Sequence, residues 1–168
     1  RGVGIAVRSP YVAAVSDKFA GNRIADLVRV AKEAPGRIYY ATAGSGTGPH
    51  LCAEIFMQAT GTVMTAVPYK GSAPALMALM AGEVQVYFDV LMSALPHLAA
   101  GKLKGLGVSS RERVAVLPGV PTFQEQSVPG LDVSVWYGVA AKAGTPEPVV
   151  QQLNAAVNRV VRSSDYIA

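Results

Sequence analysis

The stretch from Ile38 to Thr60 reads IYYATAGSGTGPHLCAEIFMQAT, and it is the most informative part of this chain. A β-prone run enters a loop of small residues, Gly44 to Gly48, and Pro49 and His50 then open an amphipathic helix. Glycines let a backbone approach a ligand closely, and the first N–H groups of a helix have no intrahelical partners. This order of strand, loop and helix predicts an anion site, which suits a carboxylate or a phosphate equally well.

The remainder of the chain alternates in the same way between β-prone runs and apolar patterns of helical period. The patterns predict strands at 2–15 (with a break at Ser9-Pro10), 37–43, 63–69, 84–91, 103–108 and 133–141. They predict helices at 24–34, 49–60, 72–81, 93–100 and 147–162, and a short helix that Thr122 and Glu125 would open as a capping box. Alternation of this kind predicts an α/β fold with a mostly parallel sheet flanked by helices.

Composition excludes several classes of protein. The chain has 168 residues and a net charge of +4, and its Lys and Arg residues are scattered, so we expect no nucleic-acid partner. No uninterrupted apolar run reaches the ~18 residues of a membrane-spanning helix. Cys52 is the single cysteine, so an intrachain disulfide is excluded.

The loop lacks the signatures of nucleotide sites. No Lys follows its glycines at the spacing of a P-loop, and Pro49 replaces the last glycine of a G-x-G-x-x-G motif. Catalysis is also disfavoured, because His50 and Cys52 lie on different helix faces and the two histidines and one cysteine lack the spacing of zinc ligands. We therefore expect no catalytic residue, no metal and no cofactor.

Two further candidates lie where other strands end. Tyr69 and Lys70 stand at a second strand-to-helix junction, and Asp89 ends an otherwise apolar strand. Carboxyl ends of parallel strands meet at one sheet edge, where ligands bind in open α/β sheets. Asp89 would receive a ligand ammonium or hydroxyl group, or else cap the next helix, and Lys70 is a ligand contact or a solvated turn residue.

Six collinear motifs resemble the tripartite tricarboxylate transporter substrate-binding proteins, the Bug receptors. They are YATAGSGTGPHL (40–51), VPYKGSAPAL (67–76), GEVQVYFD (82–89), LPHLAAGKLKGLGVSS (95–110), LPGVPTFQE (117–125) and WYGVAAKAGTP (136–146). The resemblance implies a periplasmic-binding-protein-like lobe of type II. It assigns 16–131 to domain 2, 1–15 to a crossover or remnant of domain 1, and 132–168 to the returning strand and helix of domain 1.

The resemblance also implies a site and partners. It places Gly44, Ser45, Gly46, Thr47 and His50 at a bound ligand, with Asp89 in the cleft, Tyr69 and Lys70 at its mouth, and Trp136 and Tyr137 at a hinge. The family most often has an amide residue after the aspartate, where this chain has Val90.

Those features predict a periplasmic receptor, or a lobe of one, that captures a small organic carboxylate and delivers it to a membrane permease. Because much of domain 1 has no counterpart in the sequence, we also expect a homodimer or a partner that supplies the missing lobe. The alternatives are a small enzyme that holds an acyl or phosphate anion on the loop, and a sensor or interaction domain derived from a receptor.

Overall fold

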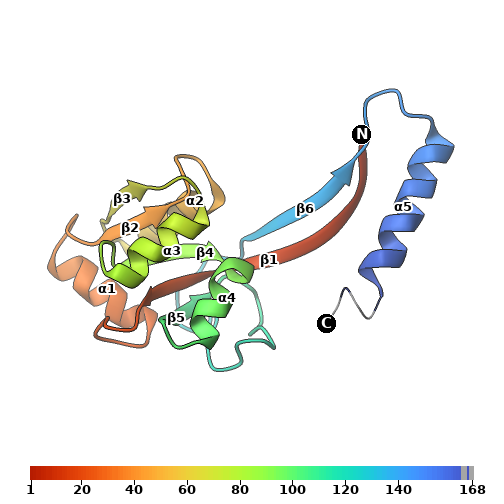
Figure 1. Ribbon diagram of the computed structural model, residues 1–168. Coiled ribbons are helices and arrows are strands. Elements are labelled where there is room, and N and C mark those ends of the chain that lie inside the picture. The colour runs from red at the N-terminus through yellow and green to blue at the C-terminus, as the bar shows by residue number, and fades with distance from the viewer. Residues whose placement is uncertain (164–165, 167–168) are drawn as a thin grey trace. The chain divides into compact units, whose positions relative to one another are not determined.

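The computed structural model describes residues 1–163 and 166 (Figure 1). By its internal contacts the chain divides into two compact units, a larger one, Pro10–Ser134, and a smaller one, Arg1–Ser9 with Val135–Ala168. The strands are β1 (Gly2–Ser16), β2 (Tyr39–Thr42), β3 (Thr65–Pro68), β4 (Val86–Val90), β5 (Leu103–Val108) and β6 (Ser134–Ala140). The helices are α1 (Ile24–Glu33), α2 (Gly48–Thr60), α3 (Ser72–Ala81), α4 (Leu91–Ala99) and α5 (Glu147–Val161).

The sheet of the larger unit has the strand order β3-β2-β4-β1-β5. Strands β2, β3 and β4 are parallel, and β1 lies antiparallel between β4 and β5. Since β5 is antiparallel to β1, it points in the same direction as the first three, so four of the five strands share one direction. Their carboxyl ends lie at one edge, and this confirms the predicted α/β fold with a mostly parallel sheet.

Both faces of this sheet are covered. Tyr87 of β4 belongs to an apolar cluster with the buried side chains of α3 and α4, among them Leu76, Leu79, Leu91 and Ala94. On the opposite face, Phe88 packs against Phe56 of α2 and against Phe123, with ring centroids 5.1 and 6.3 Å apart. Neighbouring residues of a strand point to opposite faces, so β4 contributes to both cores.

The smaller unit is built from the first part of β1, from β6 and from α5. Arg1 and Ala141 exchange a backbone hydrogen bond, and Gly138 lies against Gly4, so β1 and β6 run antiparallel. Asn154 of α5 donates a side-chain hydrogen bond to the carbonyl oxygen of Val3 at 2.6 Å. Val150 is the one buried residue of α5, so most of this helix is exposed.

Several local expectations differ from the structure. β1 is one strand through Ser9-Pro10, and residues 122–127 form a turn rather than a helix, although Thr122 and Glu125 do exchange capping-box hydrogen bonds. The predicted helix at 147–162 is present as α5, but its apolar residues Val149, Leu153 and Val160 are exposed, because the described residues do not cover them.

Candidate functional site

The loop between β2 and α2 is held in shape by its own hydrogen bonds. Gly44 and Gly46 have φ angles of 121° and 74°, a region that side chains disfavour. Thr47 donates its hydroxyl to the carbonyl oxygen of Gly44 at 2.7 Å, and the N–H of Gly44 donates to Thr42 Oγ1 at 3.1 Å. The glycines therefore serve the conformation of the loop, and Thr47 closes it.

The first turn of α2 follows this loop directly. Thr47 is the N-cap, but its side chain bonds within the loop and makes no capping hydrogen bond to the helix. The first turn contains no acidic residue, and Ser45 and Gly46 are exposed beside it. The positive end of the helix dipole thus has no charged partner in its own turn, which favours an anion at this position.

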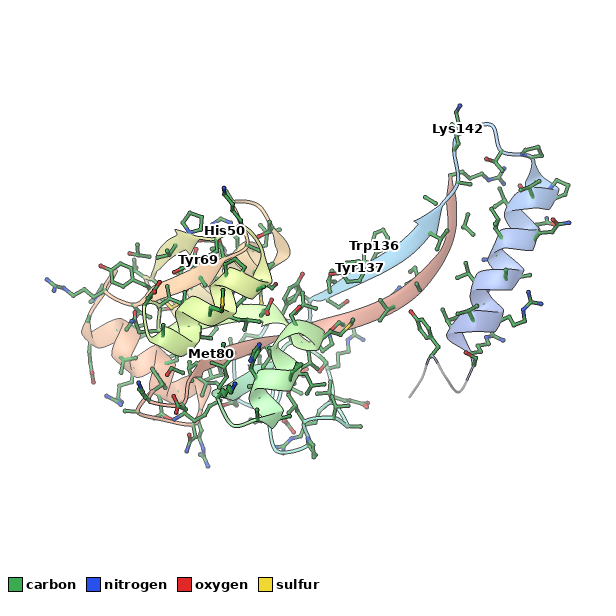
Figure 2. The ribbon with its side chains drawn as sticks, viewed as in Figure 1. His50, Tyr69, Met80, Trp136, Tyr137 and Lys142 are labelled. Atoms are coloured by element: carbon green, nitrogen blue, oxygen red, sulfur yellow. The ribbon has the colours of Figure 1, made fainter. Side chains whose placement is uncertain are left out.

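His50 fastens the loop to the helix (Figure 2). Its Nδ1 accepts the N–H of Gly46 at 3.3 Å, and its Nε2 lies 3.6 Å from Glu54 Oε1. Its ring stacks on Tyr40 with centroids 6.4 Å apart, and the Tyr40 hydroxyl donates to the same Glu54 oxygen at 2.7 Å. An Nδ1 that accepts a hydrogen bond carries no proton, so the ring proton lies on Nε2, on the side of Glu54. His50 has a structural partner on each nitrogen.

Asp89 is fully buried, with 0% of its surface exposed. Its Oδ1 accepts the Ser72 hydroxyl at 2.7 Å, and that hydroxyl lies 3.2 Å from the Tyr87 hydroxyl. Its Oδ2 has no hydrogen-bond partner among the described residues. Burial raises the pKa of the Asp89 carboxyl, against the opposing effect of the Ser72 hydrogen bond. Buried oxygens without partners are costly, so this one marks Asp89 as a candidate for a ligand contact.

Asp89 and the glycine loop lie at the same edge of the sheet, but they adjoin different helices. Ala41 pairs with Tyr87, so Asp89 lies level with residue 43, where the loop begins. Asp89 bonds to the first residue of α3, whereas the loop opens α2 on the opposite face of the sheet. Val90, and not Asp89, is the N-cap residue of α4, and the Val90 side chain makes no capping hydrogen bond.

The remaining candidates are Tyr69, Lys70, Trp136 and Tyr137, and they are more exposed than Asp89. The backbone N–H of Tyr69 donates to the carbonyl oxygen of Thr42 at 2.8 Å, and its ring packs on the α3-side cluster. Burial, and secondarily the charge of Glu83, raise the pKa of Tyr69. Lys70 is exposed in the turn before α3. Trp136 and Tyr137 belong to the smaller unit, and they are 62% and 51% exposed.

Sequence reasoning missed two members of the site. One is Ser72, whose hydroxyl donates a hydrogen bond to Asp89. Tyr87 shares that contact, and burial and the Asp89 charge raise its pKa. The signal for Tyr87 was present, because residues i and i+2 of a strand point to the same face.

The single cysteine is buried, and the described residues contain no cluster that would hold a metal ion. Burial raises the pKa of the Cys52 thiol to about 12, so it stays protonated and unreactive. Across residues 1–163 and 166, no three His, Cys, Asp or Glu side chains gather in a way that would bind a metal. No helix in this part of the chain has the length and apolar character needed to cross a membrane.

All 168 residues match the family described as the tripartite tricarboxylate transporter family receptor. The chain belongs to this family. A UPF0065 protein from the tcbD-tcbE intergenic region of Pseudomonas sp. (strain P51) is 36% identical over 98% of this chain and 49% of its own length. Protein BugT of Bordetella pertussis is 31% identical over 94% of this chain and 48% of its own length. The chain thus spans about half the length of these curated relatives.

Solved structures give the same result. Rpa4515 of Rhodopseudomonas palustris, solved with adipate, has a TM-score of 0.92 and 35% identity over 98% of this chain and 55% of its own. MatC from the same organism, solved with malate, has a TM-score of 0.89 and 32% identity over 98% of this chain and 56% of its own. The periplasmic binding protein BugD matches with a TM-score of 0.90. The family and these relatives are solute-binding receptors and not enzymes, as the sequence predicts.

Proposed function

We propose that this chain is part of an extracytoplasmic receptor that captures a small organic carboxylate for a transporter of the tripartite tricarboxylate type. The single observation that carries the proposal is the glycine loop from Gly44 to Thr47, which leads into an uncapped first turn of α2. Related receptors of known structure hold adipate and malate, so the anion we infer is a carboxylate rather than a phosphate. The membrane permease of the transporter is the partner that would receive it.

In this proposal the backbone of the loop holds the carboxylate, and no Arg clamp is required. The loop and first turn contain no Arg or Lys between Gly44 and His50. A helix-end charge contributes about 0.3–1 kcal/mol when exposed and up to about 2 kcal/mol when partly buried. Hydrogen bonds from several N–H groups add about 0.5–1.5 kcal/mol each. Asp89, Tyr69 and Lys70 would contact the remainder of the ligand, with Asp89 accepting from a hydroxyl or ammonium group.

We further propose that the described site is one wall of a cleft that another lobe completes. The larger unit has one surface hollow lined by Arg111 and Asp132, and another lined by Arg23 and Arg113. Neither hollow includes a residue of the glycine loop. The chain covers only 55% of the length of the adipate-bound relative. The missing contacts would come from the lobe that the remaining length of such a receptor forms.

The smaller unit would join that lobe. An apolar hollow is lined there by Ala6, Val139 and Val160 among others, and Val149, Leu153 and Val160 are exposed along α5. A homodimer is the other way to cover this surface. Trp136 and Tyr137, two and three residues beyond Ser134 at the end of the larger unit, would lie at the hinge on which the lobes close.

Calorimetry with adipate, malate and the uncharged adipamide tests the proposal. The chain should bind the two carboxylates, more weakly than a complete receptor, and should not bind adipamide. Thr47→Ala should weaken carboxylate binding several-fold without unfolding the protein, because it removes the hydrogen bond that closes the loop. Equal binding of adipate and adipamide, or unchanged affinity in Thr47→Ala, would contradict the assignment.

A further inference from the structure

The part of strand β1 that belongs to the larger unit begins at Pro10. The next residue, Tyr11, forms hydrogen bonds with the buried Ser109. The backbone N–H of Tyr11 donates to Ser109 Oγ at 2.8 Å, and its carbonyl oxygen accepts the Ser109 N–H at 2.9 Å. Ser109 Oγ also donates to the carbonyl oxygen of Val133 at 2.5 Å. Ser109 is 1% exposed, so one buried residue binds both segments that lead out of this unit.

The side chain of Tyr11 lies on the same sheet face as α2. Its cross-strand partner is Val90 of β4. Val90 lies two residues after Phe88, so both point to the sheet face on which α2 packs. The Tyr11 ring is buried, with 6% exposed. Its hydroxyl therefore reaches the α2 face from a backbone position that Ser109 fixes.

This hydroxyl contacts the first residue of α2. A Cβ on Gly48 would overlap the Tyr11 hydroxyl and would lie 2.8 Å from Cζ, closer than side-chain carbons normally approach. Gly48 does not have the positive φ of Gly44 and Gly46, so its reason for being glycine is space and not backbone conformation. The close approach joins Tyr11 to the turn that begins the proposed carboxylate site.

We propose that Tyr11 is a positioning residue that sets where the first turn of α2, and with it the carboxylate loop, lies. Ser109 binds the Tyr11 backbone by hydrogen bonds, and the Tyr11 hydroxyl contacts Gly48. Gly48 follows the loop directly, so its position determines where the loop ends. The ligand part of this inference rests on the proposed function. The support of Gly48 by Tyr11 is a statement about this chain alone and can be tested without ligand.

A pair of glycine variants tests the contact. Gly48→Ala should shift the backbone amide signals of Gly44 and Gly46 and weaken adipate binding about tenfold or more. Gly119→Ala is the matched control, because Gly119 has open space around its Cβ position and no positive φ. Tyr11→Leu removes the hydroxyl and Cζ, so adding it to Gly48→Ala should restore at least part of the lost affinity and return the amide signals toward those of the parent chain.

Tyr11→Phe removes only the hydroxyl oxygen and should leave the protein folded, so it tests the inference if Gly48→Ala does not fold. It should move the Gly44 and Gly46 amide signals and weaken adipate binding about threefold to tenfold, whereas Tyr39→Phe, at an exposed tyrosine of β2, should change neither. Unmoved loop signals in Tyr11→Phe, or no recovery in the double variant, would overturn the inference. If the parent chain does not bind adipate, the proposed function fails, and the amide signals still test the role of Tyr11.

Discussion

The two units of the chain differ in how completely they bury their apolar residues. In the larger unit α3 and α4 cover one sheet face and α2 covers the other, and large side chains such as Phe56, Phe88 and Leu79 have 0% of their surface exposed. In the smaller unit α5 buries only Val150, while Leu153 on the same helix is 40% exposed. The larger unit thus supplies its own core, whereas the smaller unit leaves most of its helix exposed.

A leucine-to-alanine substitution should change the free energy of unfolding far more in the larger unit than in the smaller one. Leu79→Ala should lower the free energy of unfolding by about 2–5 kcal/mol, because it opens a cavity in the complete core. Leu153→Ala should change it by about 0.5 kcal/mol or less, because that side chain is already exposed. Urea unfolding followed by far-UV circular dichroism measures both values. Equal losses in the two variants would show that the smaller unit buries Leu153 after all.

The larger unit also buries a titratable carboxyl group, that of Asp89, and this makes its stability depend on pH. The folded pKa of Asp89 is raised above its ordinary value of 3.8 by burial. Above that pH the unfolded chain releases the proton while the folded chain still holds it, so the free energy of unfolding falls as pH rises through the interval up to the folded pKa. Asp89→Asn has no such proton and should gain stability relative to the parent chain across this interval.

Unfolding of the parent chain and of Asp89→Asn at a series of pH values measures the difference. The stability advantage of Asp89→Asn over the parent chain should grow as pH rises above the ordinary pKa of a carboxyl group, and should then become constant. A difference that shrinks with rising pH would mean that the folded state stabilises the ionised carboxylate, and that the unpartnered Oδ2 is well solvated.

The smallest expected effect concerns association through the smaller unit. Exposed apolar surface favours contact with another chain, so this chain should self-associate at high concentration. Leu153→Glu should raise the dissociation constant several-fold in sedimentation equilibrium. Gln152→Glu, an exposed polar position on the same helix, is the matched control for added charge. A parent chain that stays monomeric at every concentration would contradict the claim that this surface is incomplete.

Much of the fold could be predicted from residue patterns. The bounds of α3 and β5 agree with the prediction, because Gly82 and Gly101 end the helical segments before β4 and β5. The position of β1 between β4 and β5 could not be read from the sequence, since it depends on pairing with strands far along the chain. Pro10 misled the strand prediction, but it lies just before Tyr11, where the pairing with β4 begins.

The candidate site could be predicted in part for the same reason. Gly44 to Thr47 form a local motif whose geometry follows from neighbouring residues, and the structure places them as a loop at the start of α2. The contact between Tyr11 and Gly48 joins residues that are distant in sequence, and no spacing rule predicts it. The bond from Ser72 to Asp89 likewise depends on how α3 packs on β4.

A titration with adipate, followed through the backbone amide signals of the chain, tests whether a carboxylate binds at the first turn of α2. The signals of Ser45, Gly46, Gly48 and His50 should shift with a common dissociation constant, and adipamide should move none of them. Shifts confined to residues away from the loop, or the same shifts with adipamide, would contradict carboxylate binding at this turn.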